Sequence, residues 1–251
     1  CLAQGAYYIE SNGEVAIIDP LREVQDYIDR AKKNKAKIRY IFETHFHADF
    51  VSGHLTLAEK TGGTIVFGPN ATTKFDSHVA FDGEVFKVGD LSIIALHTPG
   101  HTMESTTYLL RDKQGKDIAI FTGDTLFAAG CGRLFEGTPE QMHDSLNIQI
   151  GGLPDDTELY FGHEYTAANL RFALSVETGN TEINKKLAAV TALRSSGKFS
   201  TPTTLAEERR TNPFMRCSSA EICETVTSRE PGHNLSEKEV FRTLRELKNN
   251  F

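Results

Sequence analysis

Residues 38–54 read IRYIFETHFHADFVSGH, and the run from His45 to Asp49 decides the fold that we predict for this chain. Its first five residues are mostly apolar, as in a buried strand, and ligand-type side chains follow at alternate positions. In an extended or tightly turned loop, His45, His47 and Asp49 can converge on one point. Imidazole nitrogens and carboxylates are ligands for zinc and iron. The sequence therefore predicts a metal site directly after a strand.

Three later segments place one more imidazole or carboxylate each at the end of an apolar strand. They are TPGHT (98–102), FTGD (121–124) and GHE (162–164). Strand ends are where α/β proteins build their sites. Together with the first run they predict one metal centre with six ligands: His45, His47, Asp49, His101, Asp124 and His163. The other histidines stand alone, and we expect surface or core roles for them: His54, His78, His97, His143 and His233.

Short strands and helices alternate up to about residue 165. Asn12-Gly13 between two apolar runs indicates a β-hairpin, and Thr138-Pro139 indicates the start of a helix near 138–147. Apolar periodicity predicts the other early elements: helices over 21–33 and 51–60, a strand over 64–68, and strands within 84–90, 91–97, 106–110, 117–124 and 158–165. An α/β domain over 1–165 is therefore expected.

From residue 166 onward we find only helical periodicity and no convincing strand. The last helix begins with a capping box, Ser236 with Glu239. Its apolar stripe is Val240, Phe241, Leu244, Leu247 and Phe251. Its basic residues, spaced three apart, are expected on the other face: Arg242, Arg245 and Lys248. Residues 166–251 are thus predicted to form a small all-α domain.

The order and spacing of THFHAD, TPGHT, FTGD and GHE resemble those of the metallo-β-lactamase superfamily. The resemblance covers the whole first domain. It implies an α/β fold of the αββα sandwich type, with the metals at one edge of the sheets. It also implies catalytic roles for Asp49 and Asp124.

The second half resembles glyoxalase II, the hydroxyacylglutathione hydrolase. The similar stretches are GCGRLFEGTPEQM (130–142), LPDDTELYFGHEYTAANLRFAL (153–174), TLAEERRTNPFMR (204–216) and LRELKNNF (244–251). The resemblance implies that residues 166–251 help to bind glutathione, with contacts from Arg133, Tyr165, Arg245 and Lys248. Guanidinium and ammonium groups suit its two carboxylates. Phe135 stands where the family has a tyrosine, so this substrate-contact position lacks its hydroxyl.

One departure lies in the metal motif, because Phe50 stands where glyoxalase II has a further histidine. Phenylalanine cannot coordinate a metal, so a second metal should bind more weakly or be absent. The segment THFHADFVSGH (44–54), with HTPGHTMESTTYLL (97–110), resembles instead the persulfide dioxygenase branch of the superfamily. That resemblance implies one non-haem iron on a facial triad of His45, His101 and Asp124. The two halves therefore point toward different relatives.

We expect an enzyme that hydrolyses S-(2-hydroxyacyl)glutathione thioesters, such as S-lactoylglutathione, with one or two zinc ions, or with iron or manganese. Two alternatives stay open: an iron dioxygenase that acts on glutathione persulfide, and a non-catalytic protein that binds metal or glutathione. The partner expected is a small glutathione conjugate, bound by a monomer.

The net charge of −7 argues against a nucleic-acid partner or a membrane surface, and no apolar stretch is long enough to cross a bilayer. The scattered cysteines, Cys1, Cys131, Cys217 and Cys223, are expected as free thiols in a reducing compartment. Cys131 in particular is expected to be structural. We therefore expect a cytoplasmic protein. The chain opens at Cys1 without Met, so an organelle matrix is the alternative location if a targeting segment has been removed.

Overall fold

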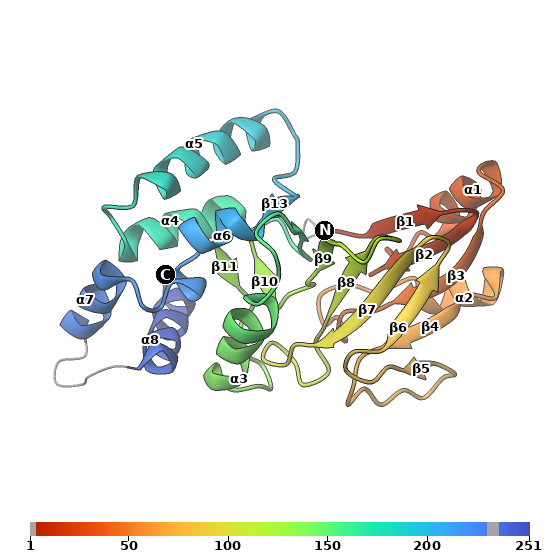
Figure 1. The fold of residues 1–251 in the computed structure, drawn as a ribbon, viewed down its shortest axis with the longest axis horizontal. Coiled ribbons are helices and arrows are strands. Elements are labelled where there is room, and N and C mark those ends of the chain that lie inside the picture. Colours follow the sequence, from red (N-terminus) through yellow and green to blue (C-terminus); the bar gives the residue numbers. More distant parts are fainter. Residues whose placement is uncertain (1–3, 230–235) are drawn as a thin grey trace.

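The computed structural model of the protein describes residues 4–229 and 236–251. Cys1 and His233, for which roles were predicted above, lie outside these residues. Two β-sheets lie face to face, and helices cover the outer face of each (Figure 1). The predicted αββα sandwich with a helical C-terminal part is therefore confirmed.

The first sheet is built mainly from residues before the metal motif. Its strands in spatial order are β1 (Tyr7–Ser11), β2 (Glu14–Ile18), β3 (Lys37–Phe42), β4 (Thr64–Phe67) and β5 (His78–Val79). Asn12 and Gly13 both have positive φ and make the β1–β2 turn, as the Asn-Gly pair predicts. The remaining strands pair in parallel. Helices α1 (Gln25–Lys33) and α2 (His54–Thr61) pack on the outer face of this sheet.

The second sheet is mostly antiparallel. Its order is β13 (Thr203–Thr204), β12 (Glu158–Tyr160), β9 (Asp117–Phe121), β8 (Thr106–Arg111), β7 (Leu91–His97) and β6 (Val85–Val88). Alternation along β7 decides which core each residue joins. Ile93 and Ala95 face the first sheet, whereas Ile94 faces the helices on the other side.

A helical layer covers the outer face of the second sheet, seen as α3, α4, α7 and α8 in Figure 1. Its elements are α3 (Pro139–Asp144), a π-helix (Ser145–Ile150), α4 (Thr166–Val176), α5 (Thr181–Ser195), α6 (Leu205–Thr211), a 3₁₀ turn (Pro213–Met215), α7 (Ala220–Arg229) and α8 (Glu237–Asn249). The capping boxes at Thr138 and Ser236 both form. A separate two-stranded hairpin, β10 (Leu126–Phe127) with β11 (Gly130–Cys131), lies between the sheet and these helices.

Three details of the prediction were wrong. The first helix begins at Gln25 and not at residue 21, because Leu21 lies in the preceding turn and is exposed. The C-terminal half does contain a strand, β13, which pairs with β12. Arg245 does not lie on an exposed face of α8: it is only 3% exposed, because it follows the buried Phe241 by four residues and so shares its side of the helix.

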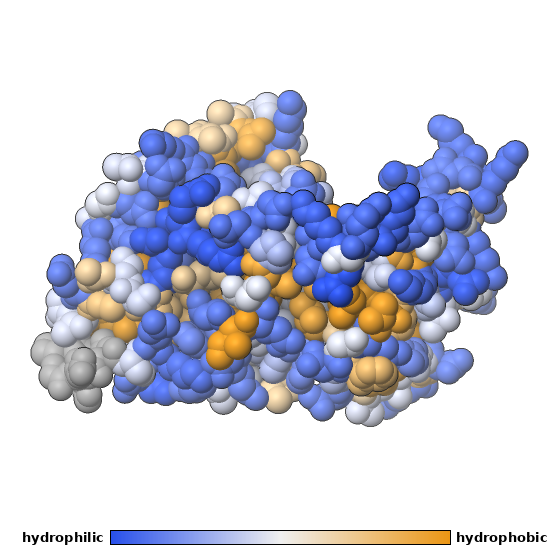
Figure 2. Space-filling model, viewed as in Figure 1, coloured by the Kyte–Doolittle hydropathy of each residue, from blue (hydrophilic) through white to orange (hydrophobic). Residues whose placement is uncertain are grey.

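Hydrophilic residues cover most of the face seen in Figure 2, and hydrophobic residues form scattered patches on it. Phe251, which was predicted in the apolar stripe of α8, is largely exposed at the end of the chain. Within residues 4–229 and 236–251, no helix is both long and apolar enough to span a lipid bilayer.

Candidate metal centre and substrate cavity

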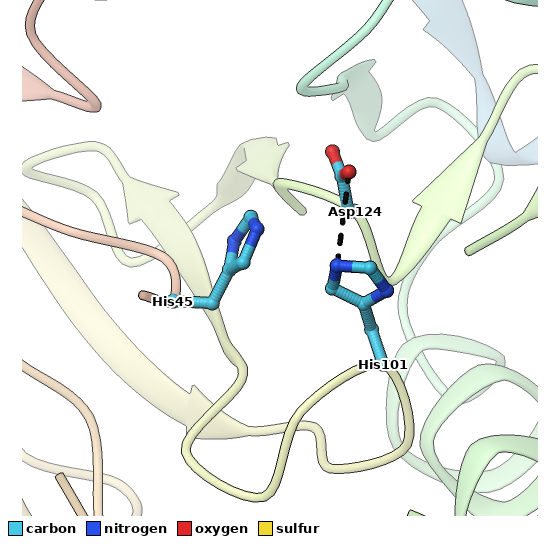
Figure 3. A group of neighbouring side chains, drawn as sticks. All are labelled: His45, His101 and Asp124. Carbon is cyan, nitrogen blue, oxygen red and sulfur yellow. Dashed lines mark ion pairs between the residues drawn. The ribbon is translucent and has the colours of Figure 1, made fainter. Parts of the chain in front are cut away.

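Three of the six predicted ligands form a compact cluster at the ends of three strands. His45 follows β3, His101 follows β7 and Asp124 follows β9. One ligand atom from each lies within 4.8 Å of the other two. Figure 3 shows His101 below Asp124, with the ion pair between them, and His45 facing both. His101 Nε2 lies 3.8 Å from Asp124 Oδ2. The arrangement fits two imidazoles and one carboxylate around one cation.

Hydrogen bonding and burial prepare both histidines of this cluster as ligands. His101 Nδ1 lies 2.8 Å from the carbonyl oxygen of Arg133. Because a carbonyl can only accept, Nδ1 carries a proton, and Nε2 is the ring nitrogen that faces Asp124 and would bind a metal. Burial, and then the neighbouring His47 and His101, hold the pKa of His45 far below its ordinary value. His45 is therefore neutral, which is the form that binds a metal.

Two further predicted ligands, Asp49 and His163, lie beside the cluster. His163 Nδ1 is 2.8 Å from Asp124 Oδ1, and His163 Nε2 is 2.7 Å from Asp49 Oδ2. Burial alone would lower the pKa of His163, but these two carboxylates raise it above its ordinary value. Asp49, His163 and Asp124 thus form one hydrogen-bonded row, in which Asp124 is shared with the cluster.

His47 is the predicted ligand that the structure does not bring to the centre. Its Nε2 lies 3.1 Å from Asp19 Oδ1 and 3.2 Å from Glu43 Oε2, with all three side chains at most 2% exposed. Burial opposes charging of His47, but the two carboxylates raise its pKa to about 10. The ring centroid of His47 lies 4.2 Å from that of His45, but in the arrangement observed its Nε2 is directed to these carboxylates. The ring of Phe50 packs on His47 at 4.4 Å and adds no ligand.

Close backbone contacts keep the strand ends together. Gly123 has φ +50, and a Cβ there would lie 2.2 Å from Thr44 Oγ1, next to His45. A Cβ at Gly162 would lie 2.4 Å from Asp124 Oδ1. Only glycine fits at either position, so the loops that carry His45, Asp124 and His163 can approach to the distances observed.

The cluster opens into a cavity of about 790 Å³ between the sandwich and the C-terminal helices. Every predicted substrate contact lines it: Arg133, Phe135, Tyr165, Arg245 and Lys248. The other five ligand candidates also line it, whereas His47 does not. Ligand-sized cavities with a few polar groups are typical of small-molecule sites.

Two cations from α8 charge one wall of this cavity. Arg245 donates from Nη1 to the carbonyl oxygen of Cys131 at 2.8 Å and lies over the ring of Phe214. None of the carboxylates in the described ranges pairs with it, and its buried Nε has no hydrogen-bond partner there. Burial, and then Arg245, lower the pKa of Lys248 to about 8. A buried cation without a counter-ion favours an anionic ligand.

Aromatic side chains frame the rest of the cavity. Tyr165 stacks on the ring of His163 with the planes 9° apart, and Phe135 packs against His101 with ring centroids 5.0 Å apart. Phe135 is 66% exposed and has no hydroxyl to offer a ligand. Cys131 is buried, and burial raises the pKa of its thiol. This is the behaviour of a structural thiol.

The sequence reasoning missed the acidic residues beneath the metal motif. Asp19 accepts hydrogen bonds from the backbone N–H and the hydroxyl of Thr44, both at 2.8 Å. Glu104 accepts the N–H of Phe46 at 2.9 Å. Asp19 ends the strand-like run EVAIID, so the strand-end rule that selected Asp124 could have selected it as well. The other histidines of the described ranges, His54, His78, His97 and His143, do not line the cavity.

Comparison with known families gives two adjoining matches. Residues 2–163 match the metallo-beta-lactamase superfamily, and residues 164–251 match the hydroxyacylglutathione hydrolase C-terminus. The cytoplasmic hydroxyacylglutathione hydrolase of Arabidopsis thaliana is 39% identical, over 99% of this chain and 95% of its own length. A hydroxyacylglutathione hydrolase of Pseudomonas syringae is also 39% identical, over 96% of this chain and 92% of its own length.

Solved structures share this fold. The structure of ETHE1 from Myxococcus xanthus superposes with a TM-score of 0.65 at 26% identity, covering 98% of this chain and 93% of that one. A metallo-beta-lactamase from Staphylococcus aureus has the same TM-score at 23% identity, covering 96% and 72%, and shows the fold alone. With its imidazoles and carboxylates at strand ends, its cationic cavity wall and these matches along its whole length, the chain belongs to the hydroxyacylglutathione hydrolase family of the metallo-beta-lactamase superfamily.

Proposed function

We propose that the protein hydrolyses S-(2-hydroxyacyl)glutathione thioesters, with S-lactoylglutathione giving lactate and glutathione, in a metal-dependent reaction. The observation that carries the proposal is one cavity with two different groups of side chains. The cluster of His45, His101 and Asp124 and the cations Arg245 and Lys248 all line the same cavity. A thioester of glutathione, a peptide with two carboxylates, needs the metal cluster for the reaction and the cations for binding. The names of the full-length relatives support the same substrate class.

We assign the first metal position to His45, His101 and Asp124, and a second, weaker position to Asp49, Asp124 and His163. His47 joins neither in the arrangement observed. Zinc is the metal proposed, as one or two ions, with iron and manganese as alternatives that the same donor set accommodates. Phe50 removes a ligand from the second position, so we expect it to be filled only partly.

A bound zinc-type ion would polarise the thioester carbonyl and lower the pKa of a water in its coordination sphere. The protein's own groups supply positioning and proton transfer. Asp49 and Asp124 are the proposed catalytic carboxylates, since both face the cavity and accept hydrogen bonds from His163. The water loses one proton to a carboxylate of the site as its oxygen bonds to the acyl carbon. The carbon–sulfur bond then breaks, and the leaving glutathione thiolate takes up that proton.

The glutathione part is assigned to the wall made by α8 and its surroundings. Arg245 and Lys248 would bind a carboxylate, and Arg133 and Tyr165 would contact the peptide next to the metal centre. Phe135 would offer only its ring. Holding the thioester in this way gives the reaction the advantage of a positioned substrate. We therefore propose residues 1–165 as the catalytic domain and 166–251 as the glutathione-binding domain.

A second candidate function rests on one feature of the cluster. Two histidines and one carboxylate form the ligand set of non-haem iron oxygenases, and the Nε2 of His47, which would complete a zinc site, lies against Asp19. On this reading the protein would oxidise glutathione persulfide with O₂. A protein that only binds metal or glutathione would do neither reaction.

Two assays on one preparation separate these functions. Purified protein, its metal content measured, is given S-lactoylglutathione while thioester loss is followed, and then glutathione persulfide while O₂ uptake is followed. Thioester turnover without O₂ uptake is expected, and Asp124→Asn should abolish it. O₂ uptake without thioester turnover would replace the proposal with the oxygenase. No turnover in either assay would leave a binding protein.

The oligomeric state, the binding partner and the cellular location are also proposals. We propose a monomer that binds a glutathione conjugate and neither nucleic acid nor membrane, in keeping with its net charge of −7. A cytoplasmic location is supported by the name of the Arabidopsis thaliana relative.

A further inference from the structure

We propose, resting on the metal-dependent function above, that Glu208 and Asn212 are positioning residues for the metal centre. They hold the hairpin that carries Asp124 and the backbone acceptor of His101, although neither residue lines the cavity. Both come from the C-terminal helical part, which the proposed function uses only to bind glutathione. The helical part would therefore also set how tightly the metal binds.

The hairpin itself has little intrinsic stability. β10 and β11 pair over only two residues each and belong to neither large sheet. Ala129 at its turn has φ +55, a conformation that residues with a Cβ rarely adopt. Isolated two-stranded hairpins are marginal in water. The observed geometry therefore depends on contacts from outside the hairpin.

Buried side chains supply those contacts at every residue of the turn. Glu208 Oε2 accepts the N–H of Ala129 at 2.6 Å. Asn212 Nδ2 donates to the carbonyl oxygens of Phe127 at 3.2 Å and of Gly130 at 3.1 Å. Asn169 Nδ2 donates to the remaining residue, at the carbonyl oxygen of Ala128, at 3.1 Å. Glu208 and Asn212 are both 0% exposed.

Glu208 is in turn fixed by its own partners. Its Oε1 lies 2.7 Å from Lys186 Nζ, and its Oε2 accepts from Asn212 Nδ2 at 3.0 Å. The Lys186 side chain is only 10% exposed. A buried ion pair of this kind adds little net stability compared with apolar packing, whereas its fixed geometry specifies one arrangement of the backbone around it. Here that backbone is the turn of the hairpin.

Both ends of the hairpin reach the metal centre within two residues. Asp124 precedes β10 by two positions, and Arg133 follows β11 by two. The carbonyl oxygen of Arg133 accepts the proton of His101 Nδ1 at 2.8 Å. A shift of the turn would thus move one ligand directly and misorient a second. Loss of such supporting contacts lowers metal affinity by about 10- to 100-fold in metalloproteins.

The test measures Zn²⁺ affinity of the folded full-length protein by competition with a chromophoric chelator. Glu208→Gln keeps the shape but removes the charged acceptor, and we expect Zn²⁺ to bind about 10- to 100-fold more weakly. The matched control is Glu177→Gln. Glu177 is another buried glutamate of the helical part, paired with Arg216 at 2.6 Å, and the hydrogen bonds described for it do not involve the hairpin. It should lower the melting temperature without changing Zn²⁺ affinity.

Asn212→Ala provides the second variant if Glu208→Gln fails to fold. It removes both hydrogen bonds to the turn without placing a second carboxylate beside Glu208, and it also removes the Oδ1 that accepts from Phe214 N. Zn²⁺ affinity within about twofold of the parent protein in either folded variant would overturn the proposal, as would an equal loss in Glu177→Gln. The readout needs no thioester, so failure of the proposed hydrolase activity would leave this test intact.

Discussion

Replacing Arg245 with methionine should weaken substrate binding far more than it slows the chemical step. Arg245 is 3% exposed, lines the cavity and has no carboxylate partner among the described residues. A charge-assisted hydrogen bond to a ligand carboxylate is worth about 1.5–3 kcal/mol. Its loss corresponds to about a 10- to 140-fold fall in kcat/KM. Because the contact lies away from the reacting carbon, the change should appear as a higher KM with kcat nearly unchanged.

The assay is steady-state hydrolysis of S-lactoylglutathione by parent and variant, both loaded with the same metal. Arg245→Met also removes the donor to the carbonyl oxygen of Cys131, which should lower the free energy of unfolding by about 1–3 kcal/mol. Arg242→Met is the matched control. Arg242 lies on the same helix but pairs with Glu140 at the surface, so its loss should leave KM unchanged. An unchanged KM in Arg245→Met, or an equal rise in the control, would refute the assignment.

Three other outcomes follow from the site. The KM for the thioester should rise as pH passes through about 8, because Lys248 loses its charge there. Lys248→Arg should flatten that rise. A pH-independent KM would show that Lys248 does not bind the glutathione carboxylate. Phe50→His should increase occupancy of the second metal position, measured as metal per chain, and unchanged occupancy would count against that position. His47→Gln should lower the free energy of unfolding, measured by urea denaturation, by about 3–5 kcal/mol, because Asp19 and Glu43 lose their buried cation. A variant that loses metal but keeps its full stability would show that His47 is a ligand instead.

The parts of the fold that the sequence predicted correctly are those with a strong local signal. Asn12-Gly13 determines a turn by its backbone preference, and Ser236 with Glu239 determines a helix start by its hydrogen bonds. The two-residue strands β5, β10, β11 and β13 carry too few residues for an alternation to be visible. They form because neighbouring strands or buried side chains provide their partners.

The residues of the site likewise divide into those that the sequence could predict and those that it could not. His45, His101 and Asp124 were predictable because each ends a buried strand, and strand ends converge at one edge of the sandwich. The direction in which the His47 side chain points was not predictable, because alternate spacing does not determine toward which side a loop turns. That choice depends on Asp19, which is distant in sequence, and on Glu43. The burial of Arg245 likewise depends on backbone carbonyls of another segment, which no helical pattern reveals.

The most direct test of the central claim is the hydrolysis of S-lactoylglutathione by metal-free protein titrated with Zn²⁺. We predict no turnover after chelation and activity that rises to a plateau between one and two equivalents of Zn²⁺ per chain. Full hydrolysis by the metal-free protein would contradict it. So would Zn²⁺-restored turnover that survives Asp124→Asn, because the cluster at the strand ends would then not be the reacting centre.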